Sequence, residues 1–254
     1  MSLALCICVW RNAVWPGLTP GPNSNHEKDD KKMKKFGSII ALSLGIIIMN
    51  ASSALANDLT CNGVVGPVLV ENVEVPVGAT CELNGTRVRG NIQVQRNGTL
   101  VARSIRLNGN IQSDEGRDFT VLTSTVRGSI QLKKVRETLV SGNLIDGSVQ
   151  IEEATGTTNV TGNTLFGSGQ FKKNLGPIYF FGNVKIIGNV QTEENFGVID
   201  ISSNQVLGNV QIFKNMAAIS VRNNTIDQNL QCKENPAGVT QSGNTVGDNE
   251  CSPF

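Results

Sequence analysis

A short pattern recurs along the chain about every 20 residues: glycine, a small polar residue, an apolar residue and glutamine. It appears as GNIQV, GNIQS, GSIQL, GSVQI, GNVQT and GNVQI. We take the glycine that opens each copy as an anchor. The anchors are Gly90, Gly109, Gly128, Gly147, Gly167, Gly188 and Gly208, followed by Gln228 and Asp248 in the last two repeats. A period of 19 to 21 residues that persists through nine repeats is typical of a solenoid, in which each repeat forms one coil.

Apolar residues occupy two fixed columns beside the anchors, one before all nine anchors and one after the first eight, where Gly169 is the exception. Two residues before the anchor stand Val88, Leu107, Val126, Ile145, Leu165, Ile186, Val206, Ile226 and Val246. Two residues after it stand Ile92, Ile111, Ile130, Val149, Gly169, Val190, Val210 and Leu230. These positions alternate with polar ones, which indicates strands with one face inward. The sequence therefore predicts an all-β fold, a single-stranded parallel β-helix of about nine coils, with right-handed winding favoured.

Two files of amides predict that the coils stack in register. Three residues after the anchor stand Gln93, Gln112, Gln131, Gln150, Gln170, Gln191, Gln211 and Gln231. Four residues before it, in the later repeats, stand Asn143, Asn163, Asn204, Asn224 and Asn244. Stacked amides hydrogen-bond to their copies above and below. The asparagines also suit turns that need a left-handed backbone.

Charged pairs that follow the glutamines change sign at each coil. They are Asp114-Glu115, Lys133-Lys134, Glu152-Glu153, Lys172-Lys173 and Glu193-Glu194. In-register stacking places each pair beside opposite charges, whereas a shift by one coil places like charges together. Exposed pairs stabilise a fold by only about 0.2–1 kcal/mol each. We therefore expect these charges to specify the register more than to stabilise the fold; the alternative is a set of solvated turns with accidental signs.

The N-terminal residues have the order of a secretory signal. Residues 33–56 contain Lys34 and Lys35, an apolar stretch over 39–49, and Ala54-Leu55-Ala56 before a predicted cleavage at Asn57. The apolar stretch is far shorter than the roughly 20 residues that span a bilayer, so we expect no transmembrane anchor after cleavage. We interpret residues 1–32 as a mis-assigned or disordered extension. The β-helix is then assigned to residues 57–254, exported to the periplasm, the cell surface or the medium.

Four cysteines stand at the two ends of the predicted β-helix. Open ends of a solenoid expose unpaired strand edges and core, so terminal coils need caps. We therefore predict two disulfides, Cys61 with Cys81 and Cys232 with Cys251. The alternative is a metal site, which we do not expect because the chain from Asn57 onward has no histidine and the cysteine pairs stand at opposite ends.

The two cysteine-bearing ends also carry a resemblance. The opening CNGVVGPVLVENVEVPVGATC and the ending LQCKENPAGVTQSGNTVGDNEC are similar to those of a widespread set of secreted bacterial β-helix repeat proteins. The resemblance covers nearly the whole chain after Asn57 and implies a parallel β-helix, without implying an activity. More remotely, the repeat resembles that of bactofilins, polymer-forming cytoskeletal β-helices. The predicted export signal and the cysteines depart from the bactofilin pattern.

The sequence favours a protein without catalytic activity or cofactor. Its single histidine and both tryptophans precede Asn57, so no imidazole is available as a general base in the predicted β-helix. The acidic pairs recur with the repeat instead of clustering, and the isolated acidic residues Asp146 and Asp227 are four coils apart. Long insertions that would wall a cleft are missing. The alternative is a lyase or hydrolase acting on a glycan, since some β-helices have such activities.

A basic segment provides the strongest binding hypothesis. Residues 87–136 hold ten Arg or Lys against three acids, whereas residues 137–254 hold six against eleven. Arg87, Arg89, Arg106 and Arg127 stand one or three residues before their anchors, where they point outward from neighbouring coils. We expect a basic patch that binds an anionic polysaccharide or another cell-envelope component; the alternative is ordinary solvation. Nucleic acid is not expected, because export and the missing interleaved aromatics argue against it.

Three further features leave alternatives open. Gly169 interrupts its apolar column in a coil that also holds Phe166, Phe171, Tyr179, Phe180 and Phe181. A phenylalanine that fills the space beside Gly169 is favoured over an exposed aromatic patch. The outward Asn or Ser beside each Gln forms a regular lattice that suits a flat array such as crystalline glycan or ice. Opposite charge at the two ends suggests head-to-tail self-association, although capped ends argue against it.

Overall fold

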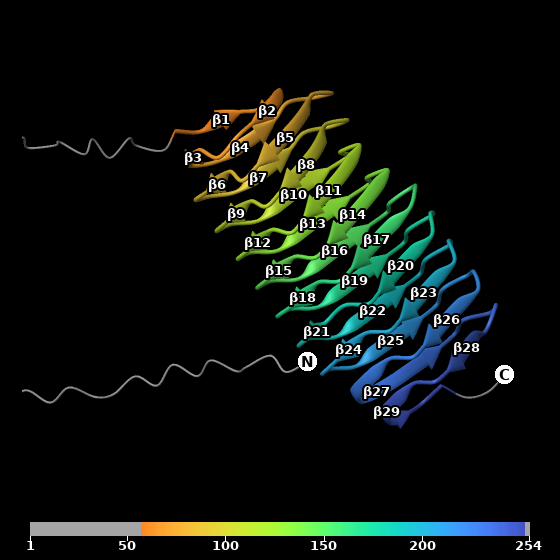
Figure 1. Ribbon diagram of the computed structural model, residues 1–254. Helices are drawn as coiled ribbons and strands as arrows, with labels where there is room; N and C mark the ends of the chain where they lie inside the picture. Colours follow the sequence, from red (N-terminus) through yellow and green to blue (C-terminus); the bar gives the residue numbers. More distant parts are fainter. Residues whose placement is uncertain (1–56, 252–254) are drawn as a thin grey trace, which may run out of the picture. The chain divides into compact units, whose positions relative to one another are not determined.

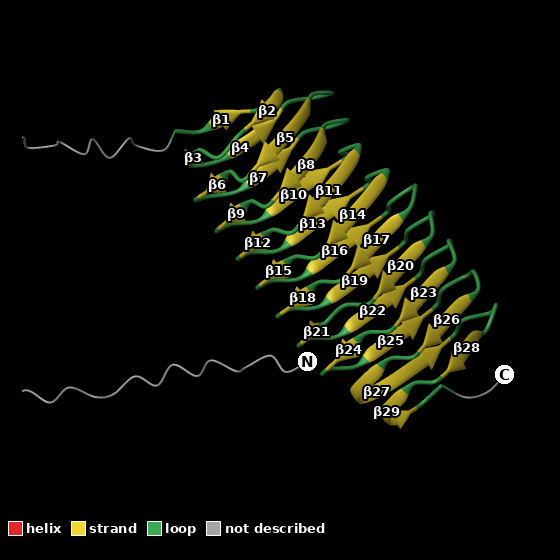
Figure 2. Ribbon diagram, viewed as in Figure 1, coloured by secondary structure: helices red, strands yellow, loops and turns green. Residues whose placement is uncertain are grey.

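The computed structural model describes residues 57–251, which consist of strands and connecting turns (Figures 1 and 2). The predicted extension 1–32 and signal 33–56 lie outside the described residues, as do residues 252–254. Residues 57–251 contain no helix, and hence none that is long and apolar enough to cross a membrane. They belong to one compact unit with its own apolar core, so we expect a chain that begins at Asn57 to fold by itself.

The strands stack into a parallel β-solenoid, as the repeat predicts. The described part has about nine coils, roughly 20 residues apart. Each regular coil contributes three strands to three parallel ladders, and successive coils follow one another along one axis in Figure 1. Neighbouring strands in such ladders are about 4.8 Å apart.

The first ladder carries the glutamine file, and we call it the glutamine face. It contains β1 (Leu59–Thr60), β4 (Val73–Val75), β7 (Ile92–Val94), β10 (Ile111–Asp114), β13 (Ile130–Lys133), β16 (Val149–Glu152), β19 (Gly169–Lys172), β22 (Val190–Glu193), β25 (Val210–Phe213) and part of β27 (Thr225–Lys233). The second ladder is a separate ten-stranded sheet, the ten-stranded face. It contains β2 (Gly63–Val65), β5 (Thr80–Asn84), β8 (Thr99–Arg103), β11 (Asp118–Leu122), β14 (Glu137–Ser141), β17 (Thr158–Thr161), β20 (Ile178–Phe181), β23 (Ile199–Ser202), β26 (Ile219–Arg222) and β28 (Val239–Ser242).

The third ladder consists mostly of two-residue strands, and we call it the arginine face. It contains β3 (Leu69–Val70), β6 (Arg87–Val88), β9 (Arg106–Leu107), β12 (Thr125–Val126), β15 (Leu144–Ile145), β18 (Thr164–Leu165), β21 (Lys185–Ile186), β24 (Gln205–Val206), part of β27 and β29 (Thr245–Asn249). Because β27 runs through both the arginine face and the glutamine face, these two ladders form a single 19-stranded sheet.

The core consists of the apolar columns read from the sequence. In the column before the anchors, residues from Val88 to Ile226 are at most 2% exposed, and in the column after them Ile92 and its copies are fully buried. Val246, in the last coil, is only partly buried, as expected for an open end. The registers pair equivalent residues of successive coils, for example Ile111 with Ile130. The prediction of in-register stacking is therefore confirmed.

The anchor is glycine because successive coils approach most closely there. A Cβ atom built on Gly128 would overlap the backbone carbonyl of Gly109 in the preceding coil, and Gly147 stands in the same relation to Gly128. The Gly128 N–H donates to the Gly109 carbonyl at this corner, with N···O 3.1 Å. Glycine therefore permits a backbone contact that a side chain would block.

Buried asparagines line two corners of the solenoid. In the predicted file, the Asn143 Nδ2 donates to the Asn163 Oδ1 at 3.0 Å and to the Val121 carbonyl at 2.9 Å. Its Oδ1 accepts the Ser124 backbone N–H at 2.8 Å, so these amides are paired although they are buried. Asn183 also belongs to this file, which the 21-residue repeat had obscured. We expected a left-handed backbone at the asparagines of this file, and this expectation is wrong. The positive φ angle belongs to the residue before each asparagine, such as Gly142 before Asn143.

A second buried file was missed by the sequence analysis. It contains Asn174, Asn195, Asn215 and Asn235, which hydrogen-bond to one another along the axis. Each follows a charged residue with positive φ at the corner between the glutamine face and the ten-stranded face. These asparagines all stand seven residues after their anchors, but the column is limited to the later coils, since the earlier ones carry Gly116, Val135 and Ala154 there.

The alternating charges lie in register, as predicted. Lys133 is the strand neighbour of both Asp114 and Glu152, and Lys172 that of both Glu152 and Glu193. Ion pairs join Lys133 to Glu152 (3.8 Å) and Lys172 to Glu193 (2.8 Å). Both predicted disulfides are present, Cys61–Cys81 with Cα atoms 5.4 Å apart and Cys232–Cys251 with Cα atoms 4.6 Å apart. They tie down the first and last coils.

Candidate functional site

The four predicted binding arginines lie together on the first coils of the arginine face. Arg87 in β6 and Arg106 in β9 are strand neighbours, so their Cα atoms are about 4.8 Å apart. Arg89 and Arg127 follow the buried residues of β6 and β12, two coils apart. All four side chains are exposed. The structure therefore brings these residues into one basic cluster, which we call the arginine cluster.

The arginine cluster differs from other arginines in its partners. Arg103 lies 3.3 Å from Glu82, Arg136 lies 2.7 Å from Asp118, and Arg222 lies 2.6 Å from Asp200; all of these arginines are on or beside the ten-stranded face. Among the described residues, no acid lies within ion-pair distance of the arginine cluster. Its guanidinium groups therefore retain their donors for a ligand.

The arginine face becomes apolar beyond the cluster. Leu144, Phe166 and Ile187 are exposed and lie in three successive coils, in the same columns as the arginines. In the column of Arg127, the exposed Asp146 stands in the next coil, and Asp227 stands four coils after it. The face thus presents a cationic end, followed by a segment in which exposed apolar side chains stand beside the charged Asp146 and Lys185.

The aromatic coil divides between core and surface. Phe171 and Phe180 are buried, with ring centroids 5.5 Å apart in an edge-to-face arrangement. A Cβ atom on Gly169 would stand 3.0 Å from the Phe180 ring and 3.4 Å from the Phe171 ring. The prediction that a phenylalanine fills the space beside Gly169 is confirmed. Phe166 and Phe181, by contrast, are exposed, and Tyr179 is half-buried.

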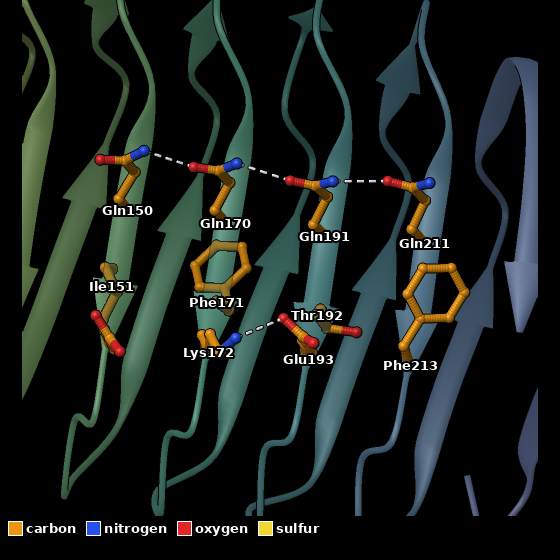
Figure 3. Close-up of a pocket in the computed structure, with 11 residues that line it drawn as sticks. Gln150, Ile151, Gln170, Phe171, Lys172, Gln191, Thr192, Glu193, Gln211 and Phe213 are labelled. Carbon is orange, nitrogen blue, oxygen red and sulfur yellow. Dashed lines mark hydrogen bonds and ion pairs between the residues drawn. The ribbon is translucent and has the colours of Figure 1, made fainter. Parts of the chain in front are cut away.

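A shallow hollow of about 340 Å³ lies on the glutamine face over β16, β19, β22 and β25 (Figure 3). Figure 3 shows Gln150, Gln170, Gln191 and Gln211 in a line, each amide donating to the next at 2.6–2.7 Å. The full series from Gln112 to Gln231 contains six such bonds. The predicted glutamine file is therefore a hydrogen-bonded ladder whose amides already satisfy one another.

The ladder ends on a carboxylate that the sequence analysis missed. Glu250 accepts the Gln231 Nε2 at 3.0 Å and the Asn229 Nδ2 at 2.6 Å. Every glutamine donates to the glutamine of the following coil, so the N–H groups of the ladder all point toward its C-terminal end. A negative charge is favourable at that end, as it is where aligned backbone N–H groups end a helix. The signal that would have revealed Glu250 is its position one coil after Asn229 and Gln231.

The charged pair beside the hollow is held in its ionised form. The hydrogen bond from Lys172 to Glu193 raises the pKa of the Lys172 ammonium group. The same bond lowers the pKa of the Glu193 carboxyl group. Catalytic acids and bases usually have pKa values shifted toward the working pH, which is the opposite direction. The pair therefore has the properties of a structural ion pair.

The outward Asn and Ser beside the glutamines also join coil to coil. The Asn110 Oδ1 accepts the Ser129 backbone N–H at 2.8 Å, and the Ser129 Oγ accepts the Ser148 backbone N–H at 3.0 Å. The same contact recurs to Asn229. These side-chain oxygens already accept hydrogen bonds from the next coil. Fewer acceptors of the outward Asn and Ser lattice therefore remain for a flat ligand.

No group of three or more His, Cys, Asp or Glu side chains suited to a metal ion occurs within residues 57–251. No family model, curated protein or solved structure matches the chain. Inference about function therefore depends on the geometry of the arginine face and the glutamine face.

Proposed function

We propose that the protein is an exported, non-catalytic β-solenoid that binds an anionic glycan or another anionic component of the cell envelope. The arginine cluster is the contact site. The observation that carries this proposal is the contrast between these arginines and the ion-paired Arg103 and Arg136. Guanidinium groups bind carboxylates, sulfates and phosphates through parallel N–H···O bonds. Stacking at about 4.8 Å between coils presents several such groups along one polymer.

Export is supported by the disulfides and by the N-terminal signal pattern. Two disulfides at the ends of the solenoid are compatible with an oxidising environment outside the cytoplasm. The resemblance to secreted bacterial β-helix proteins rests on these same cysteine-bearing ends. A cap at both ends also protects the open strand edges from pairing with other chains.

The absence of catalysis is supported by how the polar groups on the glutamine face are used. The amides bond to one another, and Lys172 bonds to Glu193. The hollow is open and shallow, whereas enzyme sites are usually concave and enclose most of a small substrate. A rod with regular polar ladders instead suits a structural or binding role.

Binding should be measured with protein that begins at Asn57. Immobilised alginate, pectin, heparin and lipopolysaccharide serve as anionic probes, with dextran as the neutral reference. We expect binding to an anionic probe that weakens steeply with salt, because charge screening shortens to about 8 Å at physiological ionic strength. Arg87→Gln with Arg106→Gln should lower the affinity about tenfold.

The matched control is Arg103→Gln with Arg136→Gln, which removes the same net charge from the ten-stranded face. This variant should bind within about twofold of the unmodified protein. Equal loss in both double variants, or no binding to any anionic probe at low salt, would contradict the proposed site. Release of reducing ends or unsaturated products from these glycans would instead establish the enzymatic alternative.

A further inference from the structure

A second exposed surface lies at the corner between the glutamine face and the ten-stranded face. Leu175, Phe196, Met216 and Pro236 occupy equivalent positions in four successive coils, and we call them the corner stripe. Leu175, Phe196 and Met216 are 50–56% exposed, and Pro236 is also exposed. Backbone bonds from the Phe196 and Met216 N–H groups to the preceding coils, both 2.8 Å, fix these residues in the stack. The stripe is roughly 14 Å long at the ~4.8 Å spacing between strands.

A column of alternating charges runs beside the corner stripe. Beside the stripe it contains Lys173, Glu194, Lys214 and Glu234, and each of these residues has a positive φ. The column continues through Glu153, Lys134 and Glu115 in the preceding coils, which lack the stripe. Lys173 lies 3.8 Å from Glu194. The column and three stripe residues line one hollow of about 550 Å³. Two positive and two negative charges cancel, so this surface favours neither an anionic nor a cationic ligand.

The order of these charges makes the surface complementary to the same surface of a second, antiparallel copy. Over the four coils of the stripe, the column reads positive, negative, positive, negative from the N-terminal to the C-terminal coil; in the opposite direction every sign is exchanged. A two-fold axis that passes between the coils of Glu194 and Lys214 places Glu194 against Lys214 of a second copy. It places Lys173 against Glu234 of that copy. The same axis lays the corner stripe on itself, centred between Phe196 and Met216.

From this symmetry we propose that the corner stripe is the contact of an antiparallel, side-by-side dimer of the chain. A two-fold interface uses the same patch on both copies, which is the commonest arrangement in homo-oligomers. The apolar stripe supplies the attraction, and the charges supply the register. An unrelated partner would need alternating charges of opposite sign at the same ~4.8 Å spacing. A second copy of the chain already has them.

Other arrangements of two copies place like charges together. In a parallel arrangement without an axial shift, each Lys faces Lys and each Glu faces Glu. An antiparallel arrangement centred on a coil, instead of between coils, also pairs like with like. The charges therefore require the two-fold axis to pass between two coils. The midpoint of the stripe, between Phe196 and Met216, independently gives the same position for the axis. The contact area of four coils is small for a stable interface, so we expect a weak dimer.

The test is sedimentation equilibrium of protein that begins at Asn57, from about 10 μM to about 1 mM, a range that covers weak association. We expect a monomer–dimer equilibrium. Glu194→Lys should weaken the dimer at least about fivefold, because two symmetry-related contacts become Lys against Lys. Glu194→Lys combined with Lys214→Glu should restore most of the affinity, because both contacts are again of opposite sign.

Two further variants distinguish a specific apolar contact at the stripe from non-specific association of exposed apolar side chains. Phe196→Ser should weaken the dimer about tenfold, whereas Val184→Ser, at an exposed apolar position on another corner, should not change it. Far-ultraviolet circular dichroism verifies that each variant is folded. A monomer at all concentrations, or a double charge variant no stronger than Glu194→Lys alone, would overturn the proposal. A dimer that Val184→Ser weakens as much as Phe196→Ser would also overturn it.

Discussion

The Lys172 Nζ lies 2.8 Å from the Glu193 Oε2 in the next coil, and Glu152 is the strand neighbour of Lys172 on the other side. Lys172→Glu would therefore place three carboxylates in successive coils. We expect a lower melting temperature at low salt, and a difference that shrinks at 1 M NaCl, where the screening length is about 3 Å. Differential scanning calorimetry measures both.

Lys185→Glu is the control for this substitution, because it makes the same change in net charge on the arginine face. Lys185 has no ion pair among the described residues, and its strand neighbour in the preceding coil is Thr164. We expect a smaller effect on the melting temperature than that of Lys172→Glu. Equal effects would show that net charge, rather than the stacked column, sets the difference.

The same ion pair predicts how stability depends on pH. The Lys172 hydrogen bond lowers the pKa of Glu193 in the folded protein below its value in the unfolded chain. A group of this kind stabilises the fold above its unfolded pKa, about 4.3 for Glu, and this contribution is lost as the pH falls through the lower folded value. Urea unfolding from pH 6 to pH 3 should therefore show a smaller decrease in stability for Glu193→Gln than for the unmodified protein. An identical decrease would contradict the assignment.

The sequence predicted the solenoid because its period persists through nine repeats, its apolar columns recur with that period, and its charged pairs change sign through five successive coils. The columns near the anchor, such as the glutamines and Val88, were assigned correctly for this reason. The residues at the opposite corner were not, because only the later coils carry Asn195, Phe196 and their copies there, whereas the earlier coils carry other residues at the same positions. Glu250 was missed for a different reason: it occurs once, at the end of a ladder, and a single residue leaves no periodic signal.

Asn195 tests how strongly the buried amide files hold the coils together. Its Oδ1 accepts the Asn174 backbone N–H and Nδ2, both at 2.9 Å, and its Nδ2 donates to the Phe171 carbonyl and the Asn215 Oδ1. Asn195→Ala removes these partners from buried groups, each of which costs about 1–3 kcal/mol when left unpaired. We expect the free energy of unfolding in urea to fall by about 3 kcal/mol or more.

Asn159→Ala provides the comparison for this substitution. Asn159 is half-buried on the outer surface of β17 and makes no side-chain hydrogen bond within the described residues. Its replacement should change the free energy of unfolding by less than about 0.5 kcal/mol. If Asn195→Ala were equally mild, the stacked amides would not be the element that holds this corner.

The contact between Gly169 and Phe180 predicts an interaction between two substitutions. A Cβ atom at Gly169 would stand 3.0 Å and 3.2 Å from two atoms of the Phe180 ring, closer than ordinary packing allows. Gly169→Ala should therefore destabilise the fold by about 1–3 kcal/mol through overpacking. Phe180→Leu alone should also destabilise it, because it leaves space in the core.

In the double variant the methyl group enters the space that the smaller side chain leaves. The loss in unfolding free energy should then be smaller than the sum of the single losses by about 1 kcal/mol, measured by urea unfolding as a double-mutant cycle. Additive losses would mean that the core does not couple these positions and that Phe180 is not what requires glycine at position 169.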